Sequence, residues 1–359
     1  MVKQTKINRI ASIEILRFFS SLMILIWHYQ HFFNPYNIFS EIEVLKKITI
    51  QPLYNLFSVI YTHGEIGVDI FFAISGFIFS YIYVNSEKKI TLKNFWVNRF
   101  ARLYPMHFLT LILVLFLQNF SFNEYGSYQI TSVNDFYHFI LNLFFISGWG
   151  FAENYSFNSP IWSVSLELIA YAIFFFSLVN IKKSVFIKAL FVLVLLVIFR
   201  KLDLVKNVNF IALELIIYYT SIFYTGVIVY FFVNKFKKNY LQFFVSVILI
   251  SLAYIGNFKI LLFCPGLLML FLAFENYLGK KIRKIFCSLG DLTYSMYLLH
   301  VPTQILLILI FQNMNIEMSV FLEIHFFIFY IFLIIMISYL SFHIIEKNLN
   351  KKIRIYLDN

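Results

Sequence analysis

The sequence predicts an all-α polytopic membrane protein, on the basis of its composition, its apolar runs and its charge distribution. About 61% of the 359 residues are hydrophobic and only 13% are charged, unlike a typical soluble domain. Apolar runs of roughly 17 to 25 residues recur along the chain, and each can cross the ~30 Å hydrocarbon core as a helix. Basic residues gather in short clusters between these runs, as orientation signals do. The net charge of +11 is thereby explained without a nucleic-acid partner.

About ten segments are expected to be transmembrane helices. The first lies at 11–33 and is retained, because no small-residue cleavage site of a signal peptide follows it. The others are predicted at 65–85, 103–120, 161–180, 186–201, 210–233, 240–257, 259–277, 291–312 and 318–344. With the N-terminus inside, most of the basic clusters fall on the inner side of the membrane. Both termini are therefore expected to be cytoplasmic.

One apolar segment, Asp135 to Gly150, is too short for a full span. Counting it as a span would place every later basic cluster outside, so a re-entrant or interfacial helix is expected there. The chain contains no internal repeat and no linker long enough to separate domains. Residues 1–359 are expected to form a single integral-membrane domain. The two cysteines have neither the spacing of a disulfide framework nor that of a metal site.

The first span carries a polar stripe. Glu14, Arg17, Ser21 and His28 are 3, 4 and 7 residues apart, which places them on one helix face. Arg17 and His28 are separated by about 16 Å of helical rise, so Arg17 is expected near the inner leaflet and His28 towards the outer one. Taken singly, a snorkelling arginine and a satisfied core histidine are equally good interpretations. Together on one face, the two residues favour a polar passage.

Two further spans carry polar residues at about the depth of His28. Asp69 lies close to the outer end of the second span. Ser75 and Gly76 follow at mid-membrane, where a small pair favours close helix packing. Glu167 lies roughly 10 Å in from the outer end of the fourth span. Its carboxylate could orient an imidazole, or it could be a protonated acid hydrogen-bonded within the bundle.

Two further clusters of polar residues are candidates for a functional site. Arg99 and Arg102 lie one turn apart on the cytoplasmic side, at the start of a helix. Guanidinium forks at a helix N-terminus suit phosphate groups, although topological charge or lipid-headgroup binding also explains them. Tyr294, Tyr297 and His300 fall three residues apart on one face of the ninth span.

In this order, the motifs resemble those of the integral-membrane acyltransferase 3 family, O-acyltransferases that modify cell-surface glycans. The matching elements are the arginine–ten residues–histidine pattern of Arg17 and His28, the arginine–two residues–arginine pattern of Arg99 and Arg102, FF-x-x-SGF at Phe71 to Phe77, W-S-x-x-x-E at Trp162 to Glu167, and Y-S-x-Y-L-x-H at Tyr294 to His300. The resemblance covers nearly the whole chain. It implies a multi-pass protein of the bacterial inner (cytoplasmic) membrane, with membrane lipids around it.

The resemblance also implies an acyl-CoA-dependent O-acetyltransferase that uses acetyl-CoA as donor substrate and no metal. The acceptor would be a hydroxyl of a surface glycan or a lipid-linked sugar. His28 would act as general base or carry the acyl group, and Glu167 or Asp69 would set its tautomer. The expected donor-binding residues are Arg17, Arg99, Arg102, Ser75, Tyr294, Tyr297 and His300.

Some members of this family carry a C-terminal extracytoplasmic esterase-like domain. The sequence ends at Asn359, soon after the last predicted span, so no such domain is expected. Transfer would then finish in the membrane part or on a separate extracytoplasmic transferase.

Two functions of other classes compete with acyl transfer. A transporter or flippase of a lipid-linked glycan or small metabolite would also need a polar stripe. Such proteins often show inverted repeats and paired broken helices, which this sequence lacks. A non-catalytic scaffold would leave the charges within the spans unexplained.

Overall fold

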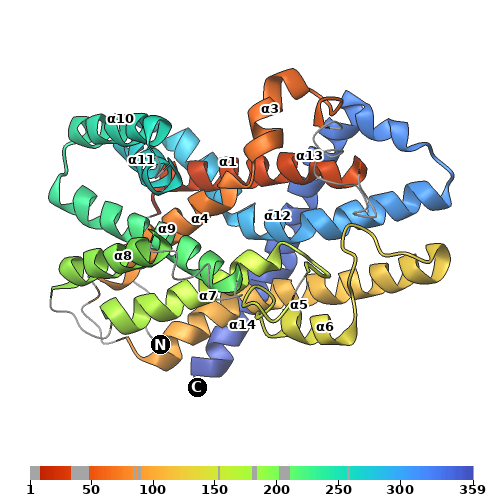
Figure 1. Cartoon of the computed structure of the whole chain (residues 1–359), viewed down its shortest axis with the longest axis horizontal. Coiled ribbons are helices and arrows are strands. Elements are labelled where there is room, and N and C mark those ends of the chain that lie inside the picture. The colour runs from red at the N-terminus through yellow and green to blue at the C-terminus, as the bar shows by residue number, and fades with distance from the viewer. Residues whose placement is uncertain are drawn as a thin grey trace. The chain divides into compact units, whose positions relative to one another are not determined.

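The computed structural model describes residues 9–33, 48–84, 86, 90–152, 154–179, 184–201, 211–256 and 259–358 (Figure 1). Every regular element in these ranges is helical. Eight helices of the described residues are long and apolar enough to cross a membrane: Ala11–Phe33, Ile66–Tyr83, Leu92–Tyr125, Ile161–Val179, Ala212–Lys235, Lys259–Tyr277, Lys280–Asn313 and Ile324–Leu357. They confirm the prediction of an all-α polytopic membrane protein.

The two other predicted spans form shorter helices. These are α8 (Val185–Lys201) and α10 (Asn239–Ile255), with 17 residues each. Such a helix is about 26 Å long, slightly less than the ~30 Å hydrocarbon core. That α8 and α10 also cross the membrane stays a prediction. The segment 135–150 contains only α6 (Phe136–Leu143), whose eight residues are too few for a span.

The structure describes only some of the basic residues from which the orientation of the chain was predicted. The structure does not describe Lys3, Lys6, Lys88, Lys182 and Lys183. The cytoplasmic placement of both termini stays a prediction. The described helices besides those named above are α3 (Tyr54–His63), α14 (Lys347–Asp358), η1 (His28–Phe33), η2 (Phe175–Val179), η3 (Glu275–Tyr277), η4 (Met318–Leu322) and η5 (Phe342–Glu346).

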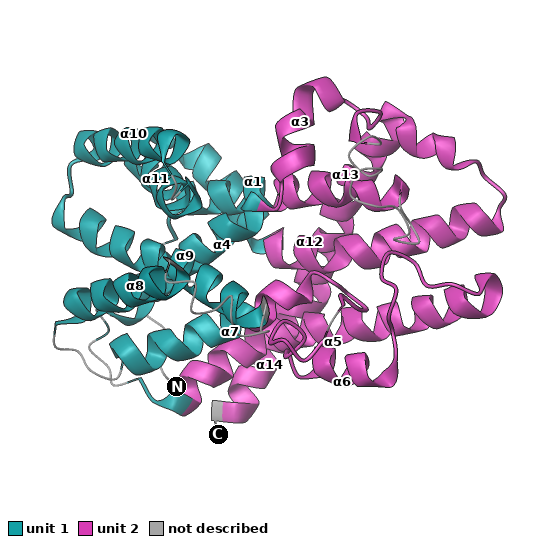
Figure 2. Cartoon of the chain, viewed as in Figure 1, with its two compact units in different colours: residues 1–20, 66–92, 166–291 teal, residues 21–65, 93–165, 292–359 magenta. Residues whose placement is uncertain are grey.

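The chain forms two compact units, shown in separate colours in Figure 2. The first consists of Met1–Ser20, Ile66–Leu92 and Leu166–Asp291. The second consists of Ser21–Glu65, Lys93–Ser165 and Leu292–Asn359.

In the first unit, two glycines bring α4 (Ile66–Tyr83) against α9 (Ile211–Lys235). A Cβ atom added at Gly76 would lie 1.9 Å from the carbonyl oxygen of Phe223, and one added at Gly226 would lie 1.9 Å from that of Ala73. The two backbones are therefore in direct contact. This confirms the packing interpretation of Gly76. In the same unit α8 packs on α9, and α10 packs on α11 (Lys259–Ala273).

In the second unit, aromatic side chains anchor η1, the 3₁₀ helix that directly follows α1 (Ala11–Trp27). The rings of Phe32 and Phe321 lie 4.5 Å apart, and those of Phe32 and Tyr330 lie 5.2 Å apart. The Tyr29 hydroxyl donates to the carbonyl oxygen of Phe321 over 2.9 Å. These contacts join η1 to η4 and to α13 (Ile324–Ser341). They hold the segment that carries His28.

Candidate active site

His28 and His300 form a hydrogen-bonded pair in the second unit. His28 is the first residue of η1, and His300 lies in α12 (Lys280–Asn313). The Nδ1 atom of His28 is 3.0 Å from the Nε2 atom of His300, and the ring planes are tilted by 27°. His300 is fully buried, whereas His28 is partly exposed. The predicted first and last motifs therefore contact each other at this pair.

The next turn of both helices adds a second contact. The Gln304 amide donates through Nε2 to the backbone carbonyl of His28 over 2.9 Å. Its Oε1 atom lies 3.0 Å from the Nδ1 atom of His31. Neither Gln304 nor His31 was expected at the site from the sequence. Their helical spacing was the available signal, because Gln304 lies four residues after His300 and His31 lies three after His28.

The tyrosines of the late motif bind other helices of the second unit. The Tyr294 hydroxyl donates to the carbonyl oxygen of Leu103 over 2.7 Å. The Tyr297 hydroxyl donates to that of Pro160 over 2.8 Å and lies 2.7 Å from the hydroxyl of Ser163. Ser163 belongs to the predicted W-S-x-x-x-E motif. The two hydroxyls therefore fasten the helix that carries His300.

In the first unit, the serine of the SGF motif contacts the glutamate of the fourth span. The Ser75 hydroxyl donates to the Oε1 atom of Glu167 over 2.5 Å. Glu167 lies in α7 (Ile161–Phe174) and is partly exposed. Two motifs far apart in the sequence thus meet within this unit.

Asp69 lies in α4 of the same unit and is buried. Its side chain hydrogen-bonds the hydroxyl group of Tyr218. The Arg200 guanidinium lies 4.6 Å from the centre of the Tyr218 ring, within the range of a cation–π contact. Tyr218 and Arg200 are further polar partners that the sequence analysis did not identify.

Arg17 belongs to an ion-pair network in the first unit. Its guanidinium lies 3.0 Å from the carboxylate of Glu14, one turn earlier. Glu14 also binds Arg9 at 3.0 Å, and Arg9 binds Asp291 at 2.9 Å. Arg17 and Glu14 are both largely buried, with 11% and 9% of their side chains exposed. The polar stripe of the first span thus contains a buried ion pair at Arg17.

Arg99 and Arg102 lie inside α5 (Leu92–Tyr125). Arg99 is buried and Arg102 is partly exposed. The prediction that both lie at the start of a helix is wrong, because α5 begins at Leu92, about 10 Å of rise before Arg99. The field of a helix N-terminus fades within the first turn. Anion binding here would therefore depend on the guanidinium groups themselves.

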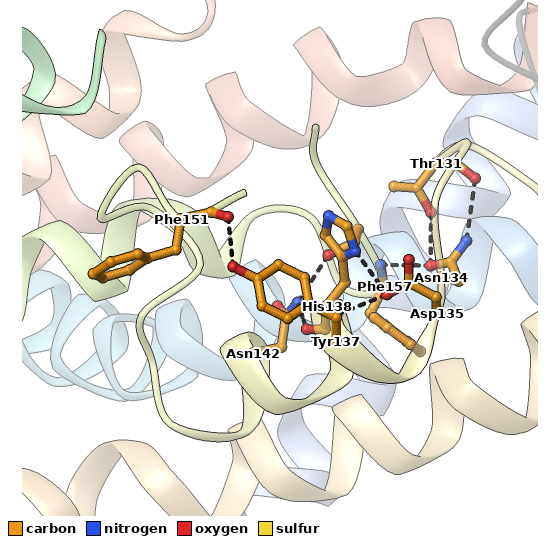
Figure 3. Close-up of polar contacts among 9 residues, drawn as sticks. Thr131, Asn134, Asp135, Tyr137, His138, Asn142, Phe151 and Phe157 are labelled. Carbon is orange, nitrogen blue, oxygen red and sulfur yellow. Dashed lines mark hydrogen bonds and ion pairs between the residues drawn. The ribbon is translucent and has the colours of Figure 1, made fainter. Parts of the chain in front are cut away.

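The loop before the fourth span is held by its own polar contacts (Figure 3). Asp135 caps α6, since its Oδ1 atom accepts from the backbone N–H of His138 over 2.9 Å and lies 2.8 Å from the His138 Nδ1 atom. These hydrogen bonds, first that of the backbone, lower the pKa of the Asp135 carboxyl group. Asn134 accepts from the backbone N–H of Phe157 over 2.6 Å. His138 therefore has a structural role here.

Within the described ranges, no group of three or more His, Cys, Asp or Glu side chains is arranged to hold a metal ion. The protein is thus a polytopic helical membrane protein with a histidine pair in its second unit, and with a serine–glutamate pair and a buried ion pair in its first.

Comparison with known families assigns it more closely. The acyltransferase-domain profile of the acyltransferase 3 family matches residues 10–343, and the chain belongs to this family. The resemblance seen in the sequence motifs is confirmed.

Two characterised relatives are distant. The peptidoglycan O-acetyltransferase OatA of Listeria monocytogenes is 29% identical over 117 residues, which are 29% of this chain and 18% of the relative. The acyltransferase MdmB of Streptomyces mycarofaciens is 29% identical over 173 residues, 47% of this chain and 39% of the relative. The chain therefore matches less than half the length of either. No solved structure matches the chain significantly.

Proposed function

We propose that this protein is an acyl-CoA-dependent O-acyltransferase of the bacterial inner membrane. It would move an acetyl or similar acyl group from cytoplasmic acyl-CoA to a hydroxyl of an extracytoplasmic or lipid-linked polysaccharide. The observation that carries the proposal is the family match over 10–343, which encloses His28 and all the other motif residues. The name of one relative, a peptidoglycan O-acetyltransferase, supports a glycan acceptor.

His28 is the proposed general base. The acceptor hydroxyl loses its proton to a ring nitrogen of His28, and its oxygen attacks the thioester carbonyl carbon. A C–O bond forms and the C–S bond breaks. The coenzyme A thiolate then takes the proton from His28, so the base is restored. Such proton transfer contributes about 10² to 10⁴ in rate. The partial exposure of His28 supports this role, since a base must reach its substrate.

The arginines are the proposed donor-binding groups. Guanidinium groups bind phosphate oxygens bidentately, so Arg99 and Arg102 would hold the phosphates of the donor, and Arg17 would meet a phosphate or the pantetheine arm. Asp69 and Glu167 are proposed to stabilise charge that develops during the reaction.

The remaining predicted donor-site residues have contacts of their own. Ser75 would hold Glu167 in place through their hydrogen bond. Tyr294 and Tyr297 would line the donor site while fastening α12 through their hydroxyls.

Mass spectrometry of surface glycans tests the proposed function in cells. Glycans from a strain that lacks the gene should have lost an acetyl or similar acyl substituent, and a plasmid with the gene should restore it. An unchanged acylation pattern, with the protein present in the membrane of the parent strain, would contradict the proposal.

A further inference from the structure

We propose that His300 is the positioning residue that fixes the tautomer of His28, so that the Nε2 atom of His28 is the one that accepts the substrate proton. The inference rests on the proposed function and deepens it. All the contacts that carry it lie within the second unit.

The contacts of His300 determine which of its ring nitrogens carries the proton. Its Nδ1 atom lies 3.3 Å from the backbone carbonyl oxygen of Met296. A carbonyl oxygen only accepts hydrogen bonds, so the Nδ1 atom of His300 must carry hydrogen. His300 is fully buried, and a charge there would be costly without an opposite charge. The neutral ring has one proton, which leaves a lone pair on Nε2.

The proton position of His300 also fixes the proton position of His28. Because the Nε2 atom of His300 can only accept, the Nδ1 atom of His28 must donate across the 3.0 Å that separates them. The two ring planes are tilted by 27°. Neutral His28 then has its lone pair on Nε2. In Ser-His-Asp enzymes, a carboxylate likewise accepts a hydrogen bond from the Nδ1 atom of the catalytic histidine and so orients the ring.

The backbone of His28 is held as well. The Nε2 atom of Gln304 donates to the carbonyl oxygen of His28, which fixes the orientation of the amide. Its Oε1 atom then accepts from the Nδ1 atom of His31. Two side chains of α12, His300 and Gln304, therefore hold both the ring and the main chain of His28. Both ring nitrogens of His300 are engaged and buried, so His300 itself is not the base.

Two substitutions of His300 separate positioning from packing. His300→Gln places an amide oxygen near the position of Nε2 and keeps an acceptor for His28. His300→Phe keeps the ring volume and removes the acceptor. With purified protein and labelled acetyl-CoA, we expect His300→Phe to lower kcat about 100-fold, within the range of general-base catalysis. The KM for acetyl-CoA should change less than about two-fold, and His300→Gln should stay within about ten-fold of the parent kcat.

Nitrogen-15 NMR of histidine-labelled protein gives a readout that does not depend on activity. The His28 signals, identified by their loss in His28→Ala, should be those of the Nδ1–H tautomer in the parent protein and in His300→Gln. In His300→Phe they should move towards the Nε2–H tautomer. An Nε2–H tautomer in the parent protein would overturn the inference, even if His300→Phe fails to fold.

The two proposals fail in different ways. An unaffected kcat in folded His300→Phe, together with an inactive His28→Ala, would overturn only the role of His300. Full transfer activity in His28→Ala would remove the catalytic base and thus the proposed mechanism itself.

Discussion

Two charged side chains in the apolar helices have partners within the same unit. Arg17 is paired with Glu14 one turn away, and Glu167 accepts from Ser75 on another helix. Such pairing is expected, because an isolated charge in hydrocarbon costs several kcal/mol. A donor phosphate at Arg17 would therefore share the guanidinium with Glu14, which occupies part of its donor fork.

The arginine pair gives a prediction at the residue scale. Replacing Arg99 and Arg102 by alanine should raise the KM for acetyl-CoA by about ten-fold or more, since each hydrogen bond to a charged group contributes about 1.5–3 kcal/mol. The measurement is a donor titration with purified protein. Lys237→Ala with Lys238→Ala is the control, because both lysines are exposed and lie outside the candidate site. An unchanged KM in the folded double variant would remove the arginines from the donor site.

The residue-level site was only partly predictable. The motifs located His28 and His300, but the contact between them joins residues 272 positions apart. Helical spacing within one sequence shows only which residues share a face. Glu167 and Asp69 were predicted as partners of His28 because all three residues were expected at a similar depth in the membrane. The direct partner of the His28 Nδ1 atom is instead His300.

At the scale of elements, the contact of α4 with α9 depends on small residues. Gly76→Ala would place a Cβ atom 1.9 Å from a backbone oxygen, so the helices must separate. Overpacking of this kind costs about 1–3 kcal/mol, and we expect a lower Tm for the detergent-solubilised variant. Gly279→Ala is the matched control, because its Cβ would meet nothing within 4 Å. Equal Tm values for the two variants would contradict the close contact.

The cap of α6 gives a second prediction for an element. Asp135→Ala should cost about 1 kcal/mol of local stability, whereas Asp135→Asn should cost only a few tenths, since asparagine caps equally well. Hydrogen exchange of the amides of Phe136–Leu143 measures this difference. Equal protection in both variants would show that the cap is not needed.

The cap should also depend on pH. Hydrogen bonds lower the pKa of Asp135 in the folded protein, so its carboxylate stabilises α6 above the ordinary aspartate pKa of about 3.9. This contribution is lost as the pH falls through the lowered folded value. Protection of α6 should therefore decrease in acid in the parent protein and not in Asp135→Asn. The same acid sensitivity in Asp135→Asn would assign the effect to another group.

Helix positions were more predictable than helix lengths. Hydropathy placed a span at 103–120, but α5 runs over Leu92–Tyr125, because its first turns are polar and still helical. Apolar composition marks the part of a helix that lies in lipid and does not show where the backbone hydrogen bonds begin. Arg99 and Arg102 were therefore predicted at the start of a helix, whereas they lie in its interior.

At the scale of the whole molecule, the number of crossings can be measured. With ten spans, Lys237 lies inside and Met314 outside. Single cysteines are introduced at these two positions in a background with Cys264→Ala and Cys287→Ala. An impermeant maleimide should label the cysteine at 237 from the cytoplasmic side and the one at 314 from the outer side. If α8 and α10 do not cross, the residue at 237 would be labelled from outside.

The division into two units was not predicted, because it arises from contacts between distant segments.

The most direct test is transfer by the purified protein in lipid nanodiscs. Labelled acetyl-CoA and a polysaccharide acceptor are supplied, and both release of coenzyme A and labelling of the acceptor are measured. His28→Ala is compared with His325→Ala, a histidine whose side chain is 93% exposed. We predict that the parent protein and His325→Ala transfer the label and that His28→Ala does not. Transfer at the parent rate by His28→Ala, or transport of an intact substrate by the parent protein without release of coenzyme A, would contradict acyl transfer at His28.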